Sequence, residues 1–129
     1  MRRTVVASLA LAMIVVGVVS AHASLQRVRS TVTISSITSY LNPDRHFILG
    51  YVNSPRAACS VGRAVRVFRR EPGDDVLVGT DRTDEGRNFS IENDGIAPSG
   101  DYYAQMRRKR RPRLGIVCKA DTSPDENVI

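Results

Sequence analysis

The sequence has 129 residues, and its 19 lysines and arginines against 13 aspartates and glutamates give a net charge of +6. It contains only two cysteines and two histidines. A chain of this length can form one domain with a modest core and is too short for two.

The first 23 residues have the features of an export signal. Arg2 and Arg3 give a cationic start, residues 5–19 are apolar without a charge, and Ala21-His22-Ala23 places small residues where a signal peptidase cleaves. The apolar run is shorter than the roughly 20 residues that span a bilayer. We therefore expect a secreted, extracytoplasmic protein with a signal peptide at residues 1–23 and a single domain at residues 24–129. The alternative is a segment that is retained as a membrane anchor.

Residues 24–129 show short runs of alternating apolar and polar residues, broken by Gly, Pro, Asn and Asp, and no sustained helical period. In the second run Ile48 and Val52 share one side, and Phe89 and Ile91 should point inward from the fifth. Repeated short strands without helices predict an all-β sandwich or small barrel. The predicted strands are residues 31–34, 47–53, 64–69, 76–80, 87–91, 102–106 and 114–118, with an eighth if residues 127–129 pair.

Cys59 and Cys118 both lie in the part that we expect to be exported. In an oxidising compartment two such cysteines favour a disulfide over a metal site or a nucleophile. The loop closed by this disulfide would hold about 60 residues, for which chain entropy predicts a stabilisation of ~4 kcal/mol.

Residues 81–92 partly match a calcium-binding loop. Asp81, Thr83, Glu85, Gly86 and Glu92 occupy positions 1, 3, 5, 6 and 12 of the EF-hand pattern. Positions 3 and 5 prefer Asp or Asn, however, and the flanking residues resemble strands where the motif needs helices. We expect an ordinary β-turn with solvated carboxylates, and no metal site.

Catalytic residues are scarce. His46 is the only imidazole after residue 23, and no Gly-x-Ser-x-Gly motif or other nucleophile signature accompanies it. A zinc site would need three or four ligands including His46, although the cysteines are expected to pair with each other. We expect His46 to be half-exposed at a strand edge, and the protein to have no enzymatic activity and no cofactor.

The positive charge is concentrated in one segment, and without it the rest of the expected domain is slightly acidic. This basic segment consists of six cations within seven residues: Arg107, Arg108, Lys109, Arg110, Arg111 and Arg113. It lies between two predicted strands, and Pro112 has no amide proton for a sheet ladder, so we expect a hairpin tip that projects into water.

Such a tip could bind polyanions by counterion release: anionic cell-wall polymers, capsule, extracellular DNA or acidic lipid headgroups. Arg63, Arg66, Arg69 and Arg70 could widen it. Nothing indicates sequence-specific nucleic-acid binding. The alternatives are a solvated loop, a charge cluster that protects a sheet edge, or a proteolytic processing site.

The order of short motifs resembles a known family. The motifs are Gly50-x-Val52-x-Ser54, Cys59, Arg63-x-Val65-x-Val67, Leu77-Val78-Gly79-Thr80, Thr83-x-x-Gly86-x-x-Phe89, Gly100-x-Tyr102-Tyr103-Ala104 and Cys118. Together they resemble small secreted bacterial proteins with a transthyretin-like, carboxypeptidase-regulatory-like β-sandwich. The resemblance implies a single prealbumin-like or Ig-like sandwich of seven or eight strands, and a binding or structural module without peptidase activity. The sequence therefore predicts an extracellular binding or structural role, with polyanion binding through the basic segment as the alternative and an enzyme with an unrecognised site as a third.

Overall fold

The computed structural model describes residues 24–129, and within that range it contains strands and two 3-10 turns but no α-helix. The expected export signal at residues 1–23 lies outside the described residues. In chain order the elements are β1 (Gln26–Val28), β2 (Thr31–Tyr40), β3 (Arg45–Asn53), η1 (Ala57–Cys59), β4 (Ala64–Arg69), β5 (Val76–Arg82), β6 (Asn88–Asp94), β7 (Gly100–Met106), β8 (Lys109–Arg111), η2 (Pro112–Leu114), β9 (Ile116–Cys118), β10 (Asp121–Thr122) and β11 (Glu126–Val128).

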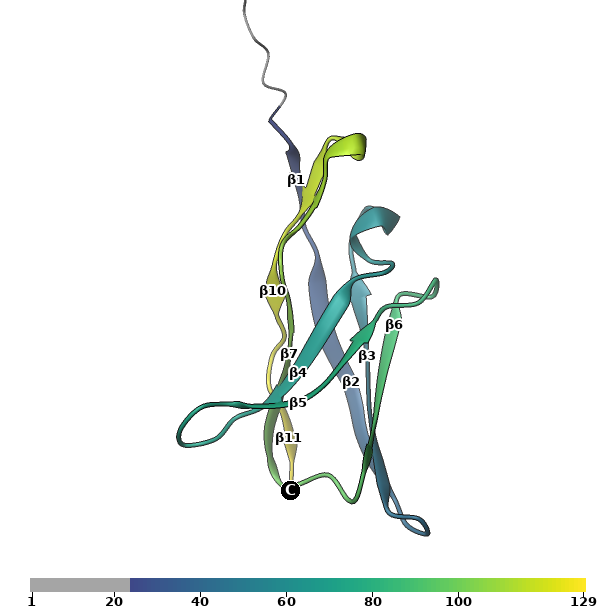
Figure 1. Cartoon of the computed structure of the whole chain (residues 1–129), viewed down its shortest axis with the longest axis vertical. Coiled ribbons are helices and arrows are strands. Elements are labelled where there is room, and N and C mark those ends of the chain that lie inside the picture. The colour runs from purple at the N-terminus through teal and green to yellow at the C-terminus, as the bar shows by residue number, and fades with distance from the viewer. Residues whose placement is uncertain (1–23) are drawn as a thin grey trace, which may run out of the picture.

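The strands form three sheets. The first has the order β2-β3-β6, and the second has the order β10-β7-β4-β5 with β11 also paired to β7. The third, small sheet has the order β1-β9-β8, in which β1 runs parallel and β8 antiparallel to β9. In Figure 1 this small sheet lies at the upper end of the molecule, beyond the two larger sheets.

The main core lies between the two larger sheets. Successive side chains of a strand point to opposite faces, so Ile48 and Val52 of β3 face Val65 and Val67 of β4, and each is at most 1% exposed. Phe89 and Ile91 of β6 complete this core and are buried, as predicted. The alternation in the sequence separates the two faces of each strand, and for β6 it also predicts which face is buried.

The all-β class and the single disulfide are confirmed, but the single sandwich of seven or eight strands is wrong. The described residues form 11 strands in three sheets. Three strands were not predicted, because none alternates between apolar and polar residues: β1 (QRV), β8 (KRR) and β10 (DT). β1 and β8 are ordered by pairing with β9, beside a second cluster of buried residues formed by Val28, Cys59, Ile116 and Cys118, and β10 is ordered by pairing with β7.

The segment between β5 and β6 is not a hairpin turn. β5 pairs with β4, whereas β6 pairs with β3, so this connection crosses from one sheet to the other. Two hydrogen bonds of 2.9 Å within the connection fix its turn. The Asp84 carbonyl accepts one from the backbone amide of Arg87, and the Asp84 carboxylate accepts the other from the backbone amide of Asn88. The connection carries the chain from the outer edge of the second sheet to the first.

Candidate functional site

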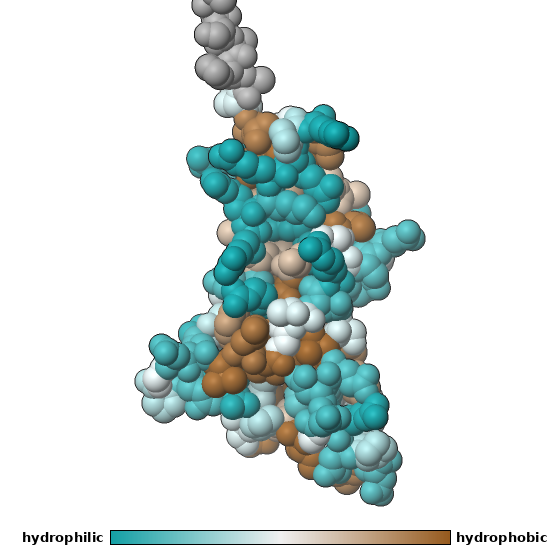
Figure 2. All heavy atoms as spheres, viewed as in Figure 1, coloured by the Kyte–Doolittle hydropathy of each residue, from teal (hydrophilic) through white to brown (hydrophobic). Residues whose placement is uncertain are grey.

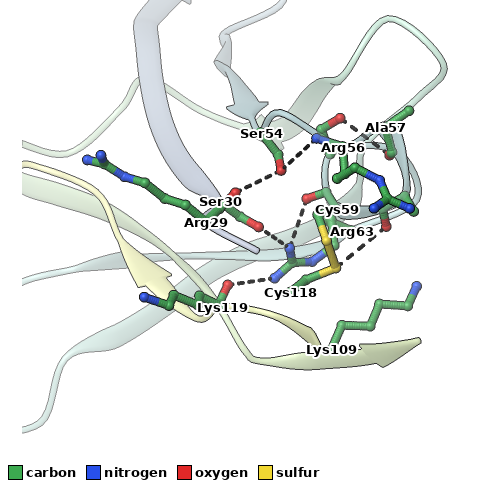
Figure 3. Close-up of a disulfide and its surroundings, with 12 residues drawn as sticks. Arg29, Ser30, Ser54, Arg56, Ala57, Cys59, Arg63, Lys109, Cys118 and Lys119 are labelled. Carbon is green, nitrogen blue, oxygen red and sulfur yellow. Dashed lines mark hydrogen bonds between the residues drawn. A yellow bond between two sulfur atoms is a disulfide. The ribbon is translucent and has the colours of Figure 1, made fainter. Parts of the chain in front are cut away.

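The predicted disulfide is present and links the small sheet to the loop between β3 and β4, which contains η1. Cys59 ends the η1 turn and Cys118 ends β9, and their Cα atoms lie 5.3 Å apart across 59 positions of sequence. Both residues are fully buried. The bond therefore holds the η1 loop against the sheet that carries half of the cations of the basic segment (Figure 3).

Beside the disulfide, Arg63 buries its guanidinium and is only 1% exposed. One terminal nitrogen donates to the Ser30 hydroxyl and to the Cys59 carbonyl, both at 2.9 Å. The other donates to the carbonyls of Arg107 at 2.9 Å and Lys119 at 3.2 Å. Figure 3 shows this side chain pointing in among Ser30, Cys59 and Lys119. One side chain thus joins its own loop, which contains Cys59, to three segments that are 33 to 56 positions away in the sequence.

The electrostatics of Arg63 are unusual, because none of these four acceptors is a carboxylate. Burying a charge without an opposite charge is expensive unless hydrogen bonds replace its hydration. Burial lowers the pKa of Arg63 below its ordinary value, and the positive charge of Arg111 lowers it further. The carbonyl dipoles stabilise the cation, but its charge is not neutralised by them.

Thr83 fixes the backbone that leads into Arg63. The buried Thr83 hydroxyl accepts a bond from the Arg63 amide at 2.9 Å and donates one to the Ser60 carbonyl at 2.7 Å. The Gly62 amide donates to the Thr83 carbonyl at 2.9 Å. Gly62 has a φ of 66°, the left-handed region that glycine adopts without strain. Its carbonyl oxygen accepts bonds from Arg82 and Lys109, both at 3.3 Å.

The basic segment is divided between a strand and its flanks, where the sequence had predicted a projecting tip. Arg107 and Arg108 form the link after β7, Lys109, Arg110 and Arg111 form β8, and Arg113 lies in η2. Arg107, Arg108, Arg110 and Arg113 are exposed, whereas Lys109 and Arg111 are half-buried because their side chains turn toward the body of the protein. In Figure 2 the upper part of the molecule, where this segment lies, shows mainly hydrophilic residues with a few hydrophobic ones among them.

The four arginines that were expected to widen the basic surface have different surroundings. Arg63 is internal, Arg69 pairs with Glu71 and Arg70 pairs with Asp125, both at 2.8 Å. Only Arg66 adds to the surface. It lines a hollow of about 390 Å³ together with Arg82, a residue that the sequence pattern did not single out. We call this site the basic hollow; its lining is Ala64, Arg66, Arg82, Arg107, Arg108 and Lys109.

The position of Arg82 follows from the pairing of β5 with β4. β5 extends two residues beyond the strand predicted at residues 76–80, and antiparallel pairing places its last residue, Arg82, opposite Ala64 at the start of β4. It therefore shares a sheet face with Arg66, whose partner on β5 is Thr80. The hollow depends on the approach of the link after β7 to this corner, which the sequence pattern does not contain.

The histidine and the carboxylates that were candidates for catalysis or metal binding make hydrogen bonds or ion pairs within the protein. His46 is buried at 4% exposure and not half-exposed as predicted, because its Nδ1 lies 2.9 Å from the Gly95 carbonyl. The Asp81 carboxylate accepts bonds from the backbone amides of Arg82 and Ser90, and Glu92 pairs with Arg45 on β3. Within residues 24–129 no group of three or more His, Cys, Asp or Glu side chains is arranged to hold a metal ion.

Comparison of the sequence with models of known protein families and with curated proteins finds no match. The resemblance to transthyretin-like proteins therefore stays a prediction. Among residues 24–129, no helix has the length and apolar character needed to cross a membrane.

Proposed function

We propose that this protein is an extracytoplasmic, non-enzymatic binding module that attaches to anionic polymers through the basic segment and the basic hollow beside it. The observation that carries the proposal is the convergence of Arg66 and Arg82 with Arg107, Arg108 and Lys109 around one hollow. Of the described residues that line it, none is acidic. A surface of this kind binds polyanions by releasing their counterions.

The disulfide supports the proposed compartment, because disulfides persist in oxidising surroundings. The predicted export signal points the same way. The resemblance to secreted transthyretin-like modules favours a binding or structural role on a β scaffold, and the proposal keeps that role and adds a class of ligand.

Chromatography on immobilised heparin tests the proposal. We expect residues 24–129 to be retained above about 0.5 M salt, since several simultaneous phosphate-like contacts give a steep salt dependence. A variant with Arg107, Arg108, Arg110 and Arg113 changed to Gln should elute early. These side chains are exposed, so the change removes charge and leaves the core intact.

The control variant has Arg45, Arg56, Arg70 and Arg87 changed to Gln, which removes the same number of exposed charges elsewhere. We expect it to elute close to the unmodified protein. Elution of the unmodified protein at low salt, or equal weakening by both variants, would contradict the proposal and favour a solvated charge cluster.

A further inference from the structure

The cations of the basic hollow reach it from separate segments. Arg66 lies in β4, Arg82 ends β5, and Lys109 begins β8, while Arg107 and Arg108 belong to the link before it. An ion that entered the hollow would meet donors on more than one side. This separates the site from a basic patch on a flat surface.

Several of these side chains are held in place without a ligand. Arg82 and Lys109 both donate to the Gly62 carbonyl, and the Arg66 guanidinium lies 4.9 Å from the centre of the Phe68 ring. Behind the hollow, Arg63 donates to the Arg107 carbonyl and so fixes the backbone of the link. A site whose donors are already positioned loses less side-chain entropy on binding.

The positive charges of Arg82 and Lys109 in the hollow are not paired with negative charges. The pKa of Lys109 is lowered by burial first, and then by the positive charges of Arg111, Arg82 and Arg63. Because Arg82 and Lys109 share one neutral carbonyl as their acceptor, their charges remain uncompensated. An anion in the hollow would relieve this repulsion.

We propose that the basic hollow is a phosphate-binding subsite, which takes one phosphate group of a phosphate-containing polymer. A phosphate group inside such a polymer has two charged non-bridging oxygens on a tetrahedral phosphorus, and a phosphate at the end of the polymer has three. These oxygens can accept charge-assisted bonds from donors on different sides of the group. A carboxylate offers two oxygens in one plane and fits a single guanidinium fork better. The inference rests on the proposed function, because it names the ligand chemistry of the same surface.

The aromatic residues beside the hollow argue against recognition of nucleic-acid bases. Proteins that bind single strands stack the bases on exposed aromatic rings. Here Phe68 and Tyr103 stack on each other with ring centres 5.4 Å apart, and Arg66 and Arg70 lie over their rings. Each ring already has a ring and a guanidinium as partners, so the hollow should recognise the phosphate and not the base.

Calorimetric titration with linear polyphosphate and with polygalacturonate tests the subsite, with the two polymers matched in number of negative charges and ionic strength. We expect polyphosphate to bind about tenfold more tightly, because charge-assisted hydrogen bonds to phosphate add to the shared counterion release. The variant Arg66→Gln/Arg82→Gln should abolish this preference. The matched variant Arg110→Gln/Arg113→Gln should weaken both polymers alike, since neither residue lines the hollow.

Equal affinity of the unmodified protein for the two polymers would overturn the subsite, as would equal effects of the two variants. Thermal unfolding of each variant is measured first, and Arg82→Gln alone replaces the pair if the pair is unstable. Single-stranded DNA with the same number of phosphates should bind no more tightly than polyphosphate; tighter binding would show base contacts and contradict recognition of phosphate alone.

Titration with inorganic phosphate, followed by amide chemical shifts, locates the site directly. We expect the largest changes at Gly62, Arg82 and Lys109, and changes spread evenly over all cationic residues would overturn the subsite. Retention on heparin at high salt without these local changes would leave the proposed function standing and remove the subsite. Early elution from heparin would remove both.

Discussion

The Arg63 guanidinium donates a hydrogen bond of 2.9 Å to the carbonyl oxygen of Cys59, so a buried cation is attached directly to one half of the disulfide. The same guanidinium reaches the carbonyls of Arg107 and Lys119, on either side of the β8-β9 hairpin. The disulfide and the hydrogen bonds of Arg63 therefore both hold the small sheet against the second sheet. The stability of this contact should depend on both kinds of link.

Substitution of Arg63 should be strongly destabilising. Arg63→Ala leaves the carbonyls of Cys59, Arg107 and Lys119 without this donor and opens a cavity. We expect the free energy of unfolding to fall by about 3 kcal/mol or more, measured by urea denaturation. Arg63→Lys should recover only part of this loss, because an ammonium group lacks the fork of donors that reaches four acceptors.

The control for Arg63 is Arg56→Ala, because Arg56 is exposed in the same loop region. We expect it to change the free energy of unfolding by no more than about 0.5 kcal/mol. Similar losses in the two variants would show that the buried hydrogen bonds of Arg63 add little to stability.

Removal of the disulfide by Cys59→Ser and Cys118→Ser together should lower the free energy of unfolding by ~4 kcal/mol, since the unfolded chain regains the entropy of the open loop. Amide hydrogen exchange should increase first in the small sheet, for example at the Gln26 amide, which bonds to Gly115. Intact mass after alkylation checks the bond itself. Uptake of two alkyl groups by the unreduced protein would contradict it.

Gly50 in the middle of β3 should not tolerate a side chain. A Cβ at this position would overlap the Phe89 ring and the Thr33 carbonyl, both of which belong to packed strands. We expect Gly50→Ala to cost about 1–3 kcal/mol in the free energy of unfolding. Gly73→Ala is the matched control, because its Cβ would meet nothing within 4 Å, and it should be close to neutral in the same denaturation experiment.

The Tyr103 hydroxyl donates a hydrogen bond to the Asp75 carboxylate, and each group shifts the pKa of the other. This bond raises the pKa of Tyr103 above its ordinary 10.0 and lowers the pKa of Asp75 below 3.8. The contribution of the bond to stability is therefore full between about pH 5 and 9. It is lost as the pH rises through the raised pKa of Tyr103, and also as the pH falls through the lowered pKa of Asp75.

Ultraviolet titration of phenolate formation measures this shift, with Tyr103→Phe identifying the signal of Tyr103. We expect Asp75→Asn to move the ionisation of Tyr103 to lower pH, because the hydroxyl no longer donates to a charged acceptor. An unchanged titration in Asp75→Asn would show that the bond does not persist in solution.

The alternation of apolar and polar residues predicted which side chains of a strand share a face. Val65 and Val67 are buried and Arg66 lies on the other face because strand side chains alternate, whatever the partner strand. Continued backward, the same alternation puts Arg63 on the buried side. A fully buried arginine without a charged partner is rare, so composition alone favours the surface for Arg63.

The sequence by itself determined the all-β class, the division of β3 and β4 into two faces, the inward face of β6, and the pairing of Cys59 with Cys118, since strand period and cysteine number are properties of the chain. Only the tertiary structure decided that Lys109 to Arg111 form a strand, that Arg63 is internal, and that Arg82 joins the basic hollow. The physical reason is that each of these depends on hydrogen-bond acceptors or neighbouring strands from distant segments. The carbonyls that hold Arg63 lie as far away in sequence as Lys119, and no local pattern encodes their approach.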